Sequence, residues 1–358
     1  MKIRSEFLVP TKSYADHTPE ATPEVLDCSL GVNPYGFPAS ARRALESFSW
    51  DRLADYPHTH RAEDAICRYW QAFAPLERQN ILLTDGSIAA LYLINCLFSK
   101  PGAEVVGFVP SFTDMLVNAR MLGMRYTPVP LDETGSAEPL LAAITADTAL
   151  VYVDNPNNPT GQTMPLAELE RIVARARALD VYVLVDEAYG DFIPPEESIL
   201  SRWGYDKLLV TRTFSKGFGL AGLRAGYIVA DPTVIGYLSK ISNPYMMNEL
   251  TREVVAAALE EPTHPMAHCG EFARVKETIR RQIGKNLTLL HTDDRVPICT
   301  LCHRNPEANL QRLLYAHGIL TVSGIDFDGL ACNCVRLRVP REEAAQRLVD
   351  AIRQVEAH

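Results

Sequence analysis

Residues 149–189 read ALVYVDNPNNPTGQTMPLAELERIVARARALDVYVLVDEAY. Two short apolar runs, at 149–153 and 181–185, flank a longer segment at 166–179 in which apolar residues recur at helical spacing. Short apolar runs that alternate with helices are typical of a parallel sheet with helices on both faces. The stretch therefore predicts a strand, a helix and a second strand parallel to the first.

The same alternation of short apolar runs and helical segments extends over residues 104–214. Beyond about residue 230, helical segments lead into shorter strands and a last helix at 341–357. We predict an α/β fold in which a mainly parallel sheet is sandwiched by helices, with a smaller α+β domain. The large domain is expected at 45–250, and the smaller one at 1–44 plus 251–358.

The composition is that of a soluble globular protein of 358 residues, with 47% hydrophobic and 22% charged residues. A formal net charge of −9 gives no basic surface for nucleic acid or an anionic membrane. The sequence has no run of 18 apolar residues, and its first 25 residues lack the apolar stretch of a signal peptide. We expect a cytoplasmic protein.

Eight cysteines are scattered over the whole length, which in a chain of this size predicts reduced thiols rather than a disulfide scaffold. Cys299, Cys302 and His303 match the short pattern for covalent haem attachment, and the two cysteines with Cys332 and Cys334 could supply four thiolates to zinc. The surrounding segment is β-prone, however, and on a strand residues 299 and 302 point to opposite faces. We interpret them as small strand residues and expect no metal.

Four successive apolar runs each end in a cluster of polar or aromatic residues. The clusters contain Ser111 and Phe112; Asn158; Asp186 and Tyr189; and Thr213, Ser215 and Lys216. In an open parallel sheet the carboxyl ends of the strands lie along one edge, where ligands bind, so the clusters should converge. A lysine amine can form a Schiff base with an aldehyde cofactor, and pyridoxal phosphate also needs an acid for its ring nitrogen and donors for its phenolic oxygen and phosphate.

The chain resembles the fold-type I pyridoxal-phosphate enzymes, specifically the class I and II aminotransferases near histidinol-phosphate aminotransferase and threonine-phosphate decarboxylase. The resemblance covers nearly the whole chain. It is carried by nine stretches in order: VNPYG at 32–36, DYP at 55–57, DGS at 85–87, PSF at 110–112, NPNNPTG at 155–161, DEAYGDF at 186–192, TRTFSKGFGLAGLRAGY at 211–227, NPYMMN at 243–248 and CVRLRVP at 334–340.

The resemblance implies catalytic roles for three residues. Lys216 is similar to the lysine that binds pyridoxal phosphate covalently and moves the substrate proton, and Asp186 to the acid that pairs with the ring nitrogen. Tyr189, together with Asn158, would donate to the phenolic oxygen, and Phe112 would lie against the ring. Plainer interpretations exist: Asp186 could cap a helix, NPNNPTG could be only a tight loop, and the aromatic residues could belong to the core.

The resemblance also assigns residues to the cofactor phosphate. These are Gly86, Ser87 and the backbone amide of Ile88 at the start of a helix, with Thr213, Ser215 and Arg224 on the other side. Relatives usually have an acidic residue after the serine, where this chain has Ile88. The backbone amide of Ile88 can still donate a hydrogen bond to the phosphate, whereas the contact that an acidic side chain would make is lost.

Further residues are expected at the substrate and at a second subunit. Tyr56 resembles a tyrosine that reaches the phosphate of the neighbouring subunit, which implies a homodimer; an ordinary tyrosine before a proline turn is the alternative. Arg336 is similar to the arginine that clamps an anionic substrate group, and Asn33 and Tyr35 of the VNPYG stretch are assigned to the same substrate site. Relatives commonly carry a second arginine where this chain has Val322, so a phosphorylated substrate is in doubt.

The leading hypothesis is transamination between an α-amino acid, or a related amine, and a 2-oxo acid, with pyridoxal 5'-phosphate as cofactor. A lyase, decarboxylase or cyclase on the same fold is the main alternative, because specialised relatives often keep the cofactor residues and alter the substrate pocket. A regulator or silent partner protein that binds the cofactor is a third hypothesis. The presence of Lys216 and the lack of an appended DNA-binding module argue against it.

Overall fold

The computed structural model describes residues 5–8, 11, 16–202, 204 and 206–357. The remaining residues, which include much of the amino-terminal stretch interpreted above, lie outside this description. They are 1–4, 9–10, 12–15 and 358 of the predicted smaller domain, and 203 and 205 of the large one.

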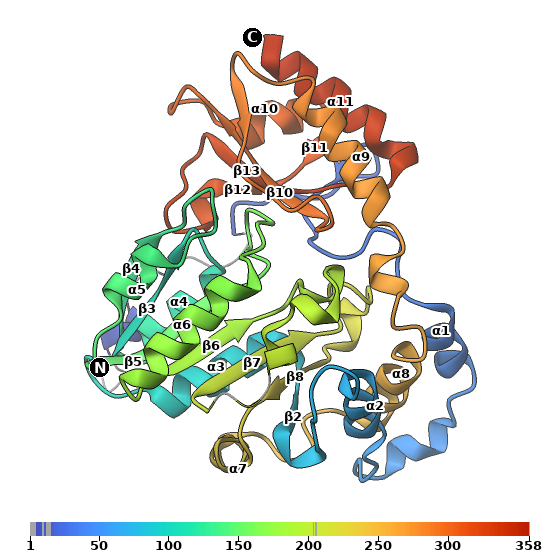
Figure 1. Cartoon of the computed structure of the whole chain (residues 1–358). Coiled ribbons are helices and arrows are strands. Elements are labelled where there is room, and N and C mark those ends of the chain that lie inside the picture. Colours follow the sequence, from blue (N-terminus) through green and yellow to red (C-terminus); the bar gives the residue numbers. More distant parts are fainter. Residues whose placement is uncertain (1–4, 9–10, 12–15, 203, 205, 358) are drawn as a thin grey trace.

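A seven-stranded sheet lies at the centre of the larger part of the molecule (Figure 1). Its strands, in spatial order, are β2 (Ile81–Thr84), β8 (Gly226–Val229), β7 (Leu208–Thr213), β6 (Tyr182–Asp186), β5 (Thr148–Asp154), β3 (Glu104–Val109) and β4 (Arg125–Pro130). Neighbouring strands are parallel except at β8, which runs antiparallel to both β7 and β2. The predicted mainly parallel sheet is confirmed.

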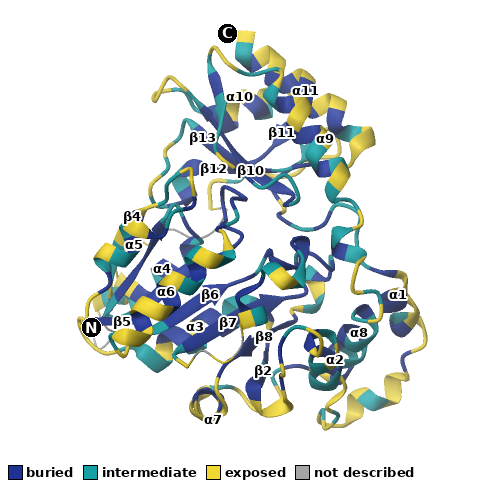
Figure 2. Ribbon diagram, in the orientation of Figure 1, coloured by how far each residue is buried: buried dark blue, intermediate teal, exposed yellow. Residues whose placement is uncertain are grey.

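Helices cover both faces of this sheet, and its central strands are therefore buried along their length (Figure 2). On one face, Leu150 and Leu184 share a core with α3, α4 and α7. On the other face, Val151 and Val183 share a core with α1, α2, α5, α6 and α8. The bounds of these helices are α1 (Ala39–Glu46), α2 (Arg61–Trp70), α3 (Gly86–Phe98), α4 (Thr113–Met121), α5 (Glu138–Ala143), α6 (Leu166–Ala178), α7 (Pro232–Ile241) and α8 (Glu249–Ala258).

The smaller part, at the top of Figure 1, is α+β, as predicted. Its antiparallel sheet has the order β12 (Val322–Ser323), β13 (Cys334–Arg338), β10 (Ile298–His303) and β9 (Leu287–Leu289). Three helices accompany it: α9 (Cys269–Arg280), α10 (Leu310–Ala316) and α11 (Glu342–Ala357). Near the amino terminus, β1 (Leu26–Asp27) pairs in parallel with β11 (Ile319–Leu320).

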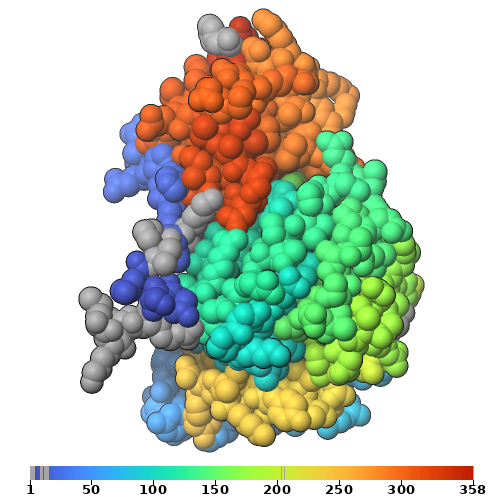
Figure 3. All heavy atoms as spheres, turned by 90° about the vertical axis from the view of Figure 1, so that its left-hand side faces the viewer, coloured from blue at the N-terminus to red at the C-terminus, as the bar shows by residue number. Residues whose placement is uncertain are grey.

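The amino-terminal segment, blue in Figure 3, lies along both parts of the molecule. The 3-10 helix Ser5–Leu8 contacts α4 of the larger part, and His17 Nδ1 lies 2.5 Å from Oδ1 of Asp326 in the smaller part. Across the portion of the chain that the structure describes, no helix is long and apolar enough to cross a membrane.

The predicted domain boundary at 250/251 falls within α8. Val254 and Ala258 of this helix share the hydrophobic core of the larger part with Ala41 and Ala44 of α1. The division into two domains stays a prediction, but this packing favours assigning both α1 and α8 to the larger domain.

The prediction of eight reduced thiols is wrong for two cysteines, because Cys302 and Cys334 form a disulfide. They lie directly opposite each other on the antiparallel strands β10 and β13, with their Cα atoms 4.1 Å apart. The two cysteines are 32 residues apart in the sequence, and this spacing does not reveal that their strands pair in a register that brings them together. Cys299 lies on β10, as expected, and is buried in the core of the smaller part, so the disulfide removes two of the four thiolates that a zinc site would need.

Candidate active site

The strand ends of the central sheet meet around a cavity of about 170 Å³. Predicted residues from three strand ends line it, namely Asn158 after β5, Asp186 and Tyr189 at β6, and Ser215 and Lys216 after β7. The clusters converge because parallel strands end at the same edge of a sheet. Four more predicted residues also line it: Ser87, Ile88, Phe112 and Arg224.

One side of the cavity is suited to an anion. The thirteen-residue helix α3 begins at Gly86, and Ser87 and Ile88 of its first turn line the cavity, where unpaired N–H groups and the helix dipole favour negative charge. A Cβ atom on Gly86 would lie 2.7 Å from Arg224 Nη2, so glycine is needed for this guanidinium to approach the helix. Thr213, which was also predicted at the phosphate, does not line the cavity, and its Oγ1 donates to Ser215 Oγ at 3.0 Å.

Lys216 lines the cavity together with Asp186 and Arg224. Its Nζ is 5.6 Å from the centre of the Tyr189 ring. Burial lowers the pKa of Lys216 to about 8, and the charges of Arg336 and Arg224 act in the same direction, while Asp186 opposes them. The amine is therefore neutral, and able to act as a nucleophile, at a lower pH than an exposed lysine.

Asp186 is 2% exposed and is held by hydrogen bonds on both oxygens. Oδ1 accepts from Thr211 Oγ1 at 2.9 Å and from the backbone N–H of Ala188 at 3.1 Å, and Oδ2 accepts from Tyr152 Oη at 3.5 Å. Burial raises the pKa of Asp186 to about 6, against the lowering effect of these donors and of Lys216. A cationic group at this carboxyl would favour its ionised form.

Asn158, Tyr189 and Arg336 lie around the remaining part of the site. Asn158 Oδ1 is buried and has no hydrogen-bond partner in the described part of the chain. A Cβ atom on Gly31 would lie 2.1 Å from Tyr189 Oη and 2.8 Å from Arg336 Nη1, so only glycine lets the backbone pass here. Arg336, on β13, is fully buried and donates to the carbonyl oxygen of Ser29.

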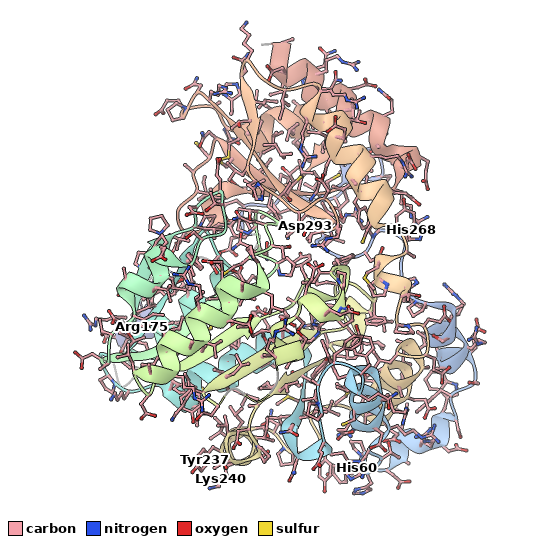
Figure 4. All side chains as sticks on the ribbon, in the orientation of Figure 1. His60, Arg175, Tyr237, Lys240, His268 and Asp293 are labelled. Atoms are coloured by element: carbon pink, nitrogen blue, oxygen red, sulfur yellow. A yellow bond between two sulfur atoms is a disulfide. The ribbon has the colours of Figure 1, made fainter. Side chains whose placement is uncertain are left out.

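Of the two other residues predicted at the substrate, one lies beside the site and one does not. The backbone N–H of Asn33 donates to the carbonyl oxygen of Lys216 at 2.9 Å, and its Nδ2 donates to that of Gly217 at 2.9 Å. Tyr35 instead donates to Glu271 and stacks on His268, the residue labelled beside α9 in Figure 4, with ring centroids 3.6 Å apart. Tyr35 does not line the cavity.

Tyr56 also lies away from the cavity of its own chain. It is 71% exposed and pairs with Tyr245, which is 50% exposed, with ring centroids 4.8 Å apart. The contact of Tyr56 with a neighbouring subunit stays a prediction.

The sequence analysis missed three residues that shape the site. Asp154 ends β5 and lines the cavity, and it was given no role from the sequence. Thr211 and Tyr152, which hold Asp186, lie inside strands, where their side chains share a face with it. The strand-end rule could have identified Asp154, whereas the other two require the register of neighbouring strands.

Comparison with known proteins identifies the family. The sequence pattern of the class I and II aminotransferases matches residues 23–352. Histidinol-phosphate aminotransferase 2 of Ralstonia nicotianae is 37% identical over 66% of this chain, a match that spans 63% of that relative's length. Histidinol-phosphate aminotransferase 1 of the same organism is 32% identical over 94% of this chain and 90% of its own.

A solved structure agrees with this assignment over most of the chain. The histidinol-phosphate aminotransferase of Sinorhizobium meliloti, in complex with pyridoxal-5'-phosphate, has a TM-score of 0.78 and 25% sequence identity, covering 92% of this chain and 90% of that one. The chain belongs to the family of class I and II aminotransferases.

Proposed function

We propose that this protein is a pyridoxal-phosphate-dependent aminotransferase, which transfers an amino group between an α-amino acid or a related amine and a 2-oxo acid. The observation that carries the proposal is the single cavity in which Lys216, Asp186 and Arg224 meet. Relatives that cover the chain are named as aminotransferases, which favours amino transfer over the lyase alternative.

The residues of the cavity fit pyridoxal phosphate at each of its polar groups. The first turn of α3 with Arg224 and Ser215 suits the phosphate, Asp186 suits the ring nitrogen, and the side-chain amide of Asn158, which lines the cavity, can donate from Nδ2 to the phenolic oxygen. When bound, the cofactor supplies an aldehyde for covalent attachment and a ring that withdraws electrons from the substrate.

The protein's own groups then determine the chemistry. Lys216, whose pKa burial lowers to about 8, would attach the cofactor and, as its neutral amine, would move the proton at the substrate α-carbon. Asp186 would stabilise a proton on the ring nitrogen by its charge. Tyr189 and Asn158 would orient the phenolic oxygen, and the apolar walls formed by Phe112 and Ala188 would exclude water.

A half-reaction assay tests this proposal. An amino donor added alone to the holoprotein should abolish the visible absorbance of the lysine-bound cofactor, which should return only when a 2-oxo acid is supplied. A lyase would release product and recover its absorbance without the acid. Recovery in the absence of any 2-oxo acid, for every donor that reacts, would contradict the proposal.

The residues around Arg336 indicate which chemical class of substrate the site would take. Val322 lies directly opposite Arg336 in the pairing of β12 with β13, at the position where relatives commonly carry a second arginine. One buried guanidinium suits one anionic group, such as a carboxylate. We therefore favour an amino acid with a single anionic group at this position over the doubly anionic histidinol phosphate named for the relatives.

Replacing Arg336 by alanine should raise KM for the amino donor by tens-fold, or about 2 kcal/mol, because a charge-assisted contact to the substrate is lost. Cofactor affinity should stay within about two-fold, because the phosphate is held elsewhere. Steady-state kinetics and cofactor titration measure the two effects. Arg338→Ala is the control, since Arg338 donates to the carbonyl of Asp27; a similar change in KM there would show that the effect is not specific.

We also propose a cytoplasmic homodimer in which Tyr56 reaches the neighbouring cavity. The exposed pair of Tyr56 and Tyr245 supports it, because exposed aromatic clusters commonly mark protein interfaces. Sedimentation of the holoprotein should give twice the chain mass of 39.8 kDa, and a single species at the mass of one chain would rule the dimer out.

A further inference from the structure

Asp154 is a buried carboxyl group in the cavity wall to which the proposed function gives no role. It lies directly opposite Asp186 in the register of β5 and β6, and it lines the same cavity as Lys216. Residues in register on neighbouring strands point to the same face of the sheet. Asp154 is 6% exposed, and a carboxylate buried to this extent is costly unless its oxygens are hydrogen-bonded.

Both carboxylate oxygens of Asp154 accept hydrogen bonds from the loop that carries Asn158. The backbone N–H of Asn158 donates to Oδ2 at 3.0 Å, and Nδ2 of Asn157 donates to Oδ1 at 2.9 Å. Asn157 Nδ2 also donates to the carbonyl oxygen of Pro110 at 2.9 Å. The carboxylate thus fixes the Asn158 peptide at the end of β5, and the Asn158 side chain lines the cavity from there.

The titratable groups around Asp154 are Asp186 on β6, Tyr152 on β5 and Tyr126 on β4. Burial, with the charge of Asp186 as a smaller contribution, raises the pKa of Asp154 to about 7, against the hydrogen bonds from Asn158 and Asn157 and a smaller lowering effect of the Ser111 hydroxyl. A protonated oxygen is a donor and accepts poorly. Both bonds to the loop are therefore complete above this pKa, and one weakens as the pH falls below it.

We infer that Asp154 is a positioning residue that holds Asn158 in place to bind the phenolic oxygen of pyridoxal phosphate. The inference rests on the proposed function, which supplies the cofactor. Asp154 acts through the Asn158 peptide and needs no contact with the substrate.

The experiment compares two cofactors that differ only at the phenolic oxygen. Pyridoxal phosphate and 3-deoxypyridoxal phosphate are bound to the wild-type chain and to Asp154→Asn, and both affinities are measured by equilibrium dialysis at pH 8. The asparagine side chain keeps the shape but turns one acceptor into a donor that faces a donor. We expect an approximately ten-fold loss of affinity for pyridoxal phosphate, and a loss of less than about two-fold for the deoxy compound.

Asp147→Asn is the matched control, because Asp147 is exposed just before the opposite end of β5. Equal losses for both cofactors in Asp154→Asn, or no loss for either, would overturn the inference. If thermal melting shows that this variant does not fold, Asp154→Ala serves in the same comparison. Binding of neither cofactor to the wild-type chain would instead refute the proposed function, so the two failures are distinct.

The pH dependence gives a second readout that a merely structural role would not produce. In the wild-type chain, the affinity for pyridoxal phosphate relative to that for the deoxy compound should fall as the pH is lowered from 8 to 6. The reason is that Asp154, with a pKa of about 7, becomes protonated over this range, which weakens the hydrogen bonds that hold Asn158. In Asp154→Asn this ratio should change less over the same pH range. A ratio with the same pH dependence in both chains would assign the titration to another group.

Discussion

Lys216→Ala is expected to abolish the visible absorbance of the bound cofactor and to lower the rate of amino transfer by at least about 10⁴-fold. The lysine supplies both the nucleophile for attachment and the group that moves the substrate proton, so its loss removes two functions at once. The fold should persist, because alanine relieves the burial of an amine whose pKa is already lowered. Absorption spectroscopy, single-turnover kinetics and thermal melting measure the three effects.

Lys216→Arg is the informative companion variant, because it keeps a positive charge but cannot form the covalent bond. It should be as inactive as the alanine variant, which would separate covalent attachment from charge. Ser215 and Arg224 remain in both variants, so the phosphate should still bind. A normal visible spectrum in either variant would show that another amine is modified.

The pH dependence of attachment follows from the same environment. In the chain without cofactor, Lys216 loses its proton through a pKa of about 8 rather than 10.5. The initial rate of attachment should therefore rise with pH up to about 8 and level off above it, since only the neutral amine attacks an aldehyde. A rate still rising steeply near pH 10 would contradict the assigned burial.

The residues that sequence reasoning placed in the cavity lie at the ends of strands. Asp186 and Lys216 could be predicted because a parallel sheet brings its strand ends to one edge, whatever the register. The pairing of β8 with β2 and the disulfide between Cys302 and Cys334 both join segments that are distant in the sequence. Such pairings are set by tertiary packing and leave no local pattern.

Tyr35 shows a second limit of local motifs. It belongs to the VNPYG stretch whose Asn33 lies beside Lys216, yet its ring points to His268 and its hydroxyl to Glu271. Successive residues of an irregular segment diverge, and a shared motif therefore does not imply a shared contact. Asp154 illustrates the converse, since it was given no role although its place at a strand end predicted a cavity position.

Asp186→Asn should reduce the rate of the half-reaction by roughly a thousand-fold while leaving the covalent attachment of the cofactor intact. The loss reflects about 4 kcal/mol, the scale for breaking a buried charge pair, because a neutral amide no longer stabilises the proton on the ring nitrogen. The amide can still accept from Thr211 and Ala188, so the local structure should be kept. Stopped-flow spectroscopy, with a donor identified in the half-reaction assay, measures the rate.

Thr211→Val is a milder change at the same carboxyl group and serves as the control. It leaves the charge of Asp186 but removes the 2.9 Å hydrogen bond to Oδ1, so it should cost only about ten-fold. Restoring the acid as Asp186→Glu should recover part of the rate lost in the asparagine variant, since the charge returns at a shifted position. If Asp186→Asn were no slower than Thr211→Val, the charge of this residue would not be what supports the reaction, and the ring nitrogen would have to be stabilised by another group.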